Sequence, residues 1–391
     1  MMEPKIRFKG FEGEWKTPLF SEMVERISAS GQAGMLPGVE FEDIASGEGC
    51  FNKNIYQKEC HKYGKLFYEG DILFGKLRPY LKNIILADFN GVAIGDFWVL
   101  RSKGLDEKYL YTLVNSESFL KVANISSGSK MPRADWNLVS TTKFVVPSAK
   151  DEQKAIGKYF TSLDSQISAS TSRLASLKQM KAASLQAMFP QEGKTVPKIR
   201  FKGFEEEWKK VSFKDFTFHA GTKNRDNLPL ESYSISNEFG FKPQNEQFEN
   251  GGTMTQADKR MYYIVSPNSF AYNPARINVG SLGYYEGKED VIVSSLYEVF
   301  KTDDTICDKF LLYWFKTDIF QKMIEQFQEG GVRLYFFYDK MCKCSLMRPS
   351  LAEQQAIASY FTSLDRQISL QSQRLEKLKQ IKSACLDKMF V

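Results

Sequence analysis

The sequence is poor in histidine and contains no long apolar run. Only His61 and His219 occur among its 391 residues, which excludes a metal centre built from several histidines. The six cysteines follow neither a disulfide framework nor the paired spacing of zinc ligands. No apolar run approaches the roughly 18 residues that a membrane-spanning helix needs, and no apolar leader stands near Met1. We therefore expect a cytoplasmic protein with no metal site and no membrane segment.

Recognisable catalytic motifs are also missing. Gly193, Lys194 and Thr195 resemble the end of a phosphate-binding loop, but Met188 occupies the upstream position where that loop needs glycine. The 53 basic and 47 acidic residues leave a net charge of +6, which permits a polyanionic partner without requiring one. We predict no catalytic residue in this chain, so a chemical step would have to be carried out by a partner.

Two segments of the chain occur twice. Residues 4–15 return as residues 197–208 with one mismatch, Gly13 against Glu206. The pattern Glu-Gln-x-Ala-Ile-x-x-Tyr-Phe-Thr-Ser-Leu-Asp at 152–164 returns at 353–365. The blocks between these repeated segments differ in length and differ even more in sequence. We call the repeated segments the frame and the blocks between them the inserts. A duplication in which the frame is kept and the inserts vary suggests one partner bound twice and two different targets recognised.

The frame predicts two long helices, at 151–189 and 352–391. Apolar residues recur there every three to four positions, which is a heptad seam rather than a strand pattern. The seam residues are Ile156, Phe160, Leu163, Ile167, Leu174 and Leu177 in the first segment, and Ile357, Phe361, Leu364, Ile368, Leu375 and Leu378 in the second. Ser170 and Gln371 interrupt the seam at matching places. We expect one antiparallel coiled-coil pair; two separate helical hairpins are the alternative.

The inserts mix strand and helix patterns. Strand-like runs at 92–100 and 291–300 precede helix-like runs at 108–122 and 309–326. The sequence therefore predicts an α+β fold, in which two mixed α/β blocks are separated by the two long antiparallel helices and the whole has a pseudo-two-fold internal repeat.

Each block contains an apolar strand that leads into a turn with an arginine, Arg78 or Arg276, and a later glycine followed by a cation. If the ligand is a DNA duplex, cations kept in both blocks should grip phosphates, and positions that differ should read bases. The alternative is that the two arginines pair with a core carboxylate. The predicted DNA-binding residues are Lys76, Arg78, Tyr80, Lys130, Arg133, Lys223, Asn224, Arg225, Arg276, Asn278, Arg333 and Tyr335.

Taken together, these features resemble the specificity subunit of a type I restriction-modification system. The resemblance rests on the helix openings at 152–167 and 353–368, with their Glu-Gln-x-x-Ile and Phe-x-x-Leu-Asp patterns. It also rests on Gly-Asp-Ile-Leu-Phe-Gly-Lys-Leu-Arg-Pro-Tyr at 70–80 and on the stretch 127–136, with its Ser-Gly, Met-Pro-Arg and Trp. The order of these motifs along the chain, which is repeated, is the main support for the resemblance.

The resemblance implies a modular organisation. Residues 1–150 and 197–351 would be two target recognition domains, each reading half of a bipartite double-stranded DNA sequence. Residues 151–189 and 352–391 would be spacer helices that fix the unread gap, with residues 190–196 as the linker.

The resemblance also implies partners that carry out the chemistry. Two copies of a modification subunit would dock on the repeated frame and use S-adenosylmethionine to methylate one adenine per half-site at N6. A restriction subunit would translocate and cleave unmodified DNA with ATP and Mg²⁺. This chain would itself bind no cofactor. A duplicated coiled-coil adaptor that binds proteins is the main alternative, and an enzyme with an unrecognised catalytic core is a weaker one because the frame and inserts leave little chain for it.

Overall fold

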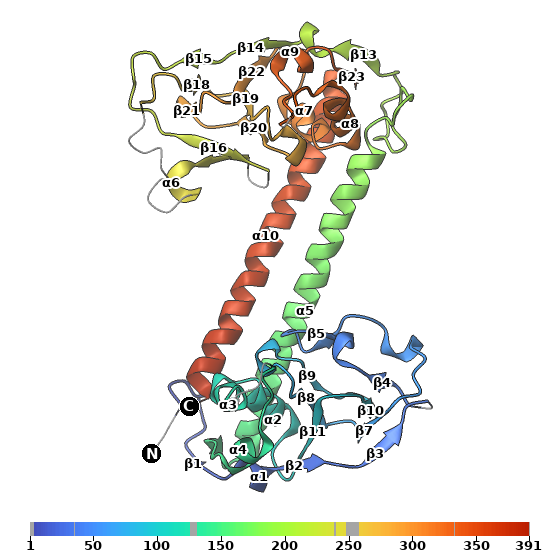
Figure 1. The fold of residues 1–391 in the computed structure, drawn as a ribbon, viewed down its shortest axis with the longest axis vertical. Coiled ribbons are helices and arrows are strands. Elements are labelled where there is room, and N and C mark those ends of the chain that lie inside the picture. The colour runs from blue at the N-terminus through green and yellow to red at the C-terminus, as the bar shows by residue number, and fades with distance from the viewer. Residues whose placement is uncertain are drawn as a thin grey trace. The chain divides into compact units, whose positions relative to one another are not determined.

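The computed structural model describes residues 4–34, 36–125, 131–237, 240–247, 258–331 and 333–390. The chain divides into two compact units: unit 1 comprises Met1–Leu174 and Leu370–Val391, and unit 2 comprises Ala175–Ser369. The long helices α5 (Lys150–Ala187) and α10 (Leu351–Met389) each contribute one part to unit 1 and one to unit 2 (Figure 1). The two predicted long helices are therefore present.

Unit 1 contains two four-stranded sheets, ordered β2-β11-β8-β9 and β3-β7-β10-β4. The strands are β1 (Trp15–Lys16), β2 (Val24–Ile27), β3 (Ser30–Gln32), β4 (Gly38–Val39), β5 (Ile44–Ala45), β6 (Cys50–Phe51), β7 (Tyr63–Phe67), β8 (Ile72–Gly75), β9 (Ile84–Leu86), β10 (Gly91–Ala93), β11 (Phe97–Ser102) and β12 (Val146–Pro147). The helices are α1 (Phe20–Met23), α2 (Glu107–Val114), α3 (Glu117–Ala123) and α4 (Trp136–Thr141), with 3-10 turns η1 (Phe41–Asp43), η2 (Ile55–Gln57) and η3 (Pro79–Leu81).

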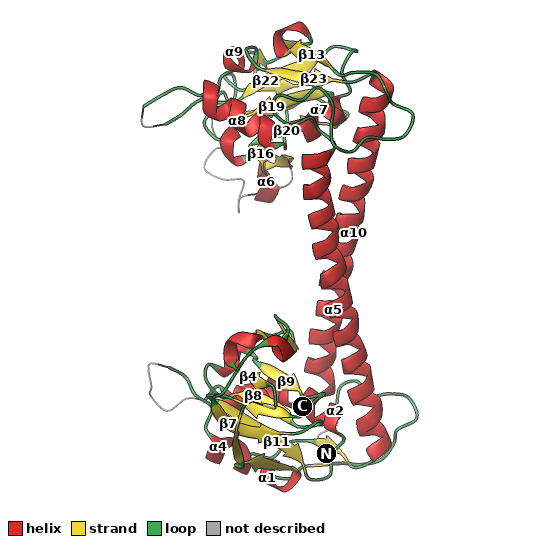
Figure 2. Ribbon diagram, turned by 90° about the vertical axis from the view of Figure 1, so that its right-hand side faces the viewer, coloured by secondary structure: helices red, strands yellow, loops and turns green. Residues whose placement is uncertain are grey.

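Alternation along β8 explains why unit 1 has two apolar clusters. Ile72 and Phe74 point to one face and join residues of α2, α3 and α4, whereas Leu73 points to the other and joins residues of β4, β7 and β10. The first cluster also takes in residues of α5 and α10, so the sheet is fixed to the long helices of the same unit (Figure 2).

Unit 2 repeats the central sheet with the order β14-β22-β19-β20, beside a three-stranded sheet β15-β18-β21. Its strands are β13 (Lys209–Ser212), β14 (Thr217–His219), β15 (Thr222–Lys223), β16 (Tyr233–Ser236), β17 (Gly240–Pro243), β18 (Tyr263–Val265), β19 (Ser269–Tyr272), β20 (Leu282–Tyr285), β21 (Val291–Val293), β22 (Glu298–Thr302) and β23 (Ser345–Arg348). Its helices are α6 (Gln244–Gln247), α7 (Asp308–Trp314), α8 (Asp318–Phe327) and α9 (Tyr338–Met341), with 3-10 turns η4 (Phe213–Asp215) and η6 (Ile277–Val279).

The helix-like and strand-like runs of the sequence are shorter in the structure than predicted. The run 108–122 is broken into α2 and α3 because the Ser116 hydroxyl accepts a hydrogen bond from the Phe119 amide and starts a new helix. The run 309–326 is broken in the same place, with Thr317 at the start of α8. The strand-like run 92–100 supplies β10 and β11, which belong to different sheets, and Gly95 turns the chain between them with a φ of 95°.

The repeated segments form a joint that is the same in both units. In unit 1, the guanidinium of Arg7 bonds both carboxylate oxygens of Glu152, at 2.6 and 2.8 Å. In unit 2, Arg200 bonds Glu353 at the same two distances. The glutamates are only 1% and 0% exposed, so these carboxylates lie inside the protein, whereas the arginines are half-buried. The arginine and the glutamate of the repeated segments therefore hold the joint in both units.

The same joint caps the long helices. The amide of Ile6 donates to the carbonyl of Lys388 at the end of α10, at 3.2 Å, and the amide of Ile199 donates to Ala187 at the end of α5, at 2.9 Å. These carbonyls are among those that a helix leaves without an internal partner. Gln153 accepts a hydrogen bond from the backbone amide of Asp106, which begins α2, at 2.9 Å. Gln354 does the same for Cys307 before α7, at 2.8 Å.

Within each unit the two long helices run antiparallel. In unit 1, Tyr159 contacts Cys385 at 3.5 Å and Asp164 pairs with Lys382 at 2.5 Å, so residue numbers rise on α5 as they fall on α10. In unit 2, Lys181 pairs with Asp365 at 2.5 Å, and the hydroxyl groups of Ser184 and Tyr360 lie 2.9 Å apart.

The seam residues of both helices are buried or half-buried. The two interruptions of the seam meet each other, because the side-chain amide of Gln371 donates to the hydroxyl of Ser170 at 2.7 Å. A polar pair at a seam position fixes the register of two helices.

Candidate nucleic-acid interface

In unit 1 the predicted DNA-binding residues gather where strand β8 ends. Arg78 adopts a left-handed φ of 51°, and Pro79 after it disfavours the ordinary helical conformation for this residue. The amide of Arg78 donates to the carbonyl of Pro132 at 2.8 Å, and the amide of Ala134 donates to the carbonyl of Lys76, also at 2.8 Å. These bonds hold Arg133 beside the end of β8.

Asp96 joins two of these cations. Its Oδ1 lies 3.4 Å from the Nζ of Lys76, and its Oδ2 lies 2.9 Å from Nη2 of Arg133. Arg78 and Tyr80 are exposed beside this group. Over the part of the chain that the structure describes, no carboxylate pairs with the guanidinium of Arg78, so the expected alternative of a core ion pair is not what this residue does.

In unit 2 four of the predicted residues line one open hollow of about 980 Å³: Arg276, Asn278, Arg333 and Tyr335. Arg276 precedes η6 just as Arg78 precedes η3, and it is exposed. Its guanidinium pairs with no carboxylate among the described residues. The hollow is therefore edged by cations whose charge is free to meet a ligand.

Aromatic residues and one half-buried acid also line this hollow. The rings of Tyr335 and Phe337 stack in parallel with centroids 5.4 Å apart. Glu298 lies in the hollow 3.4 Å from His219, and burial raises the pKa of its carboxyl above the usual value while His219 opposes the shift. Neither Glu298 nor Asp96 is among the residues predicted from the sequence, because the pattern that indicates DNA binding consists of cations and amides; Asp96 pairs with two of those cations and Glu298 with His219.

The predicted DNA-binding residues of the loop 222–227 differ in their surroundings. The ammonium of Lys223 lies 3.6 Å from the ring centroid of Tyr263, which also lines the hollow, and Arg225 is exposed. Asn224 is only 1% exposed, and its side chain is bonded to the backbone of Leu228 through both its amide and its carbonyl. In this structure Asn224 fixes the loop, which corrects its predicted place on the DNA-contacting surface. Lys130 lies outside the described residues.

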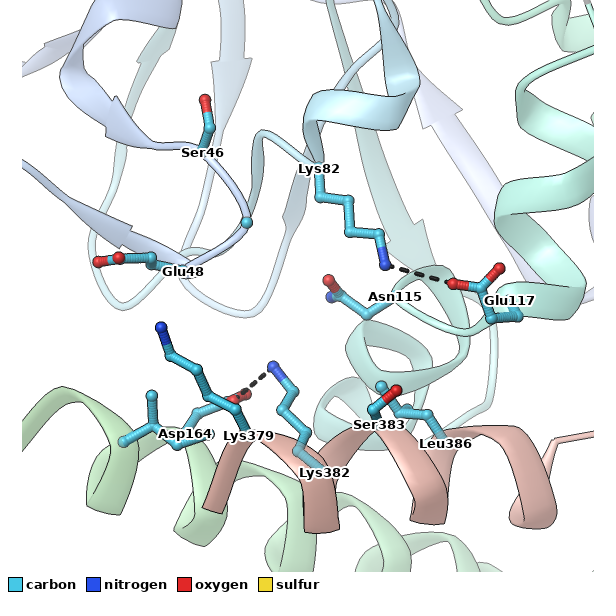
Figure 3. Close-up of a pocket in the computed structure, with 12 residues that line it drawn as sticks. Ser46, Glu48, Lys82, Asn115, Glu117, Asp164, Lys379, Lys382, Ser383 and Leu386 are labelled. Carbon is cyan, nitrogen blue, oxygen red and sulfur yellow. Dashed lines mark hydrogen bonds and ion pairs between the residues drawn. The ribbon is translucent and has the colours of Figure 1, made fainter. Parts of the chain in front are cut away.

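A second hollow of about 300 Å³ lies in unit 1 between the block and the long helices (Figure 3). Lys82 pairs with Glu117 at 3.4 Å, and Lys382 pairs with Asp164 at 2.5 Å. Burial raises the pKa of Asp164, although Lys382 opposes the shift. Two of the three lysines that line this hollow are therefore paired with acids of the same unit: the Lys82 pair lies within the block, and the Lys382 pair joins the two long helices.

Two further classes of site find no support within the described ranges. No group of three or more histidine, cysteine, aspartate or glutamate residues could hold a metal ion there. In the same part of the chain, no helix combines the length and apolar character needed to span a bilayer.

Residues 205–380 match the family model of the type I restriction modification DNA specificity domain. The MjaVIII specificity subunit of Methanocaldococcus jannaschii is 22% identical over 310 residues, covering 73% of this chain and 70% of that protein. The EcoDI specificity subunit of Escherichia coli is 24% identical over 120 residues, covering 29% of this chain and 27% of the relative. The solved structure of a type I restriction-modification S subunit from M. genitalium is 13% identical, with a TM-score of 0.66 over 100% of this chain and 99% of its own. The predicted fold class is confirmed.

Proposed function

We propose that the chain reads a bipartite double-stranded DNA target, because residues 205–380 match the model of the type I restriction modification DNA specificity domain. One half-site is read by the block in unit 1 and the other by the block in unit 2. The helices α5 and α10, which both units share, set the length of the unread gap.

The observation that carries this proposal is the pair Arg78 and Arg276. They follow equivalent strands, precede equivalent 3-10 turns, and are both exposed. Within the described ranges neither guanidinium pairs with a carboxylate. An arginine kept free of partners at the same place in two divergent blocks fits a common ligand, and DNA phosphate is bound bidentately by this group.

The partners in this proposal are two copies of a modification subunit, which hold S-adenosylmethionine and methylate one adenine per half-site. The support is that both joints present the same outer surface, with Ile6 43% and Ile199 58% exposed beside the lysines Lys5 and Lys198. Equivalent surfaces can bind two copies of one protein. A restriction subunit that uses ATP and Mg²⁺ completes the proposed complex.

Binding to DNA separates this proposal from the protein-binding adaptor. A DNA reader should bind non-specific duplex with an affinity that falls steeply as salt rises, because each neutralised phosphate releases counterions. An adaptor should show no such competition by duplex DNA. Titrations with a random-sequence duplex at several salt concentrations distinguish the two.

Replacing either free arginine should weaken binding to every sequence by a similar factor. We expect Arg78→Ala and Arg276→Ala each to reduce the slope of log K against log salt by about one, since one phosphate contact is lost. Lys103→Ala is the matched control, because this exposed lysine lies at the other end of β11 from Asp96. A methylated motif that changed in either arginine variant would show that the arginine reads bases and would contradict the phosphate assignment.

A further inference from the structure

Three positions beside the free arginine are equivalent in the two units and differ completely in chemistry. The backbone establishes the equivalence. Phe74 on β8 is paired with Trp98 on β11, and Tyr272 on β19 is paired with Glu298 on β22. Lys76 and Pro274 stand two residues after the first residue of each pair, and Asp96 and Leu296 stand two residues before the second residue.

The third position is fixed by a hydrogen bond that both units share. The carbonyl of Lys76 accepts from the amide of Ala134 at 2.8 Å, and the carbonyl of Pro274 accepts from the amide of Phe336 at 3.0 Å. The residues just before these donors are Arg133 and Tyr335. We call these positions the readout triplet: Lys76, Asp96 and Arg133 in unit 1, and Pro274, Leu296 and Tyr335 in unit 2.

In unit 1 the readout triplet presents hydrogen-bond donors in a fixed arrangement. One carboxylate oxygen of Asp96 forms an ion pair with Lys76 and the other accepts a hydrogen bond from Arg133, so the two cations stand side by side. Both keep further N–H groups, because an ammonium has three and a guanidinium five. The carboxylate also offsets their positive charge. A ligand would therefore be recognised mainly by the direction of the remaining N–H groups rather than by net charge. Guanine offers two acceptors, O6 and N7, to such a pair in the major groove.

In unit 2 the same positions carry no charged group, and Leu296 is the apolar side chain among them that is exposed. Pro274 has no amide hydrogen, and the side chain of Leu296 is 71% exposed. Tyr335 lies stacked on Phe337, and all three triplet residues line the hollow edged by Arg276. A large apolar side chain held in the open beside a phosphate-gripping arginine matches the one apolar group in the major groove, the C5-methyl of thymine.

We propose that the readout triplet selects the base next to the gripped phosphate, taking guanine in the half-site of unit 1 and thymine in that of unit 2. Lys76, Arg133 and Leu296 contact the bases, and Asp96 is a positioning residue that acts through the two cations. This inference rests on the proposed function, because it requires that the blocks read DNA.

The test is selection from a random-sequence duplex library by the chain assembled with its modification subunit. Wild-type complex should select one motif half that contains guanine and another that contains thymine. Exchange of residues 17–146 identifies which half unit 1 reads. Asp96→Asn should weaken discrimination at one guanine by roughly 10-fold to 100-fold and leave the other half-site unchanged. Lys103→Ala, with the same melting temperature required of both variants, is the control.

Base analogues test the chemistry directly. Replacing the selected guanine by 7-deazaguanine removes N7 and should weaken wild-type binding, but should change binding by Arg133→Ala little. Replacing thymine by uracil removes the methyl and should weaken wild-type binding, but not binding by Leu296→Ala. A motif that is unchanged in Asp96→Asn, or that lacks guanine in the unit 1 half-site, would overturn the inference while leaving the DNA-reading function intact. No motif at all from the wild-type complex would overturn both.

Discussion

Exchanging residues 17–146 for the corresponding block of a type I specificity subunit should change one half of the methylated motif completely and leave the other half as it was. The block brings its own two sheets and its own free arginine, Arg78. The repeated joint that holds it, Arg7 with Glu152, lies outside the exchanged segment. The exchanged block should therefore determine which half-site is recognised, and the residues outside it should still support assembly with the modification subunit.

The exchange has one structural requirement. Tyr109 of the block stacks on Phe390 with ring centroids 5.7 Å apart, and the core that contains both continues into Ile156 and Phe160 of α5. A donor block needs an aromatic residue at the place of Tyr109 to fill this core. The control is the reverse exchange of the unit 2 block, residues 210–348, which should change only the second half. A change in both halves after one exchange would contradict the modular account.

Glu353→Ala should destabilise unit 2 by about 3–5 kcal/mol, the usual cost of removing one partner from a buried ion pair. Glu353 is fully buried, and Arg200 bonds both of its oxygens. The indole of Trp208 also donates to it at 3.2 Å. The substitution would leave a guanidinium and an indole N–H without their acceptor. It would also release residues 197–208 from the start of α10.

Chemical denaturation measures this loss, and two further variants make the result specific. Glu376→Ala removes an exposed acid from the same helix and should change stability by less than about 0.5 kcal/mol. Glu152→Ala breaks the equivalent pair in unit 1 and should cost less than Glu353→Ala. The indole nitrogen of Trp15 has no hydrogen-bond partner within the described ranges, so one bond fewer is lost there. A loss below about 1 kcal/mol in Glu353→Ala would show that the joint does not hold the unit together.

The frame could be predicted from the sequence because its signals are local and repeated. The heptad spacing of Ile156, Phe160 and Leu163 is enough to identify a helix and its buried face, and the second copy of the pattern at Ile357, Phe361 and Leu364 identifies its partner. The interruptions at Ser170 and Gln371 were visible as well. That they bond each other follows only from the antiparallel register, which the sequence alone does not contain.

The role of the repeat could be predicted from the sequence only in part. The repetition predicts one partner bound twice, whereas Glu152 and Glu353, two of the repeated residues, are buried and hold the joint together. A buried ion pair between residues far apart in the chain leaves no periodic signal. The same holds for Asp96, whose role depends on strands β8 and β11 lying side by side. Asn224 shows the opposite error, because a polar residue in a polar loop can equally bond its own backbone.

The most direct test of the central claim is the adenine methylation pattern of cells that express this chain together with its modification subunit, compared with cells that lack only this chain. Single-molecule sequencing of their DNA should show a bipartite motif, methylated on one adenine per half-site, that disappears when the chain is absent. If the complex assembles and no such motif is found, the DNA-reading account is contradicted and the duplicated frame is a scaffold for proteins.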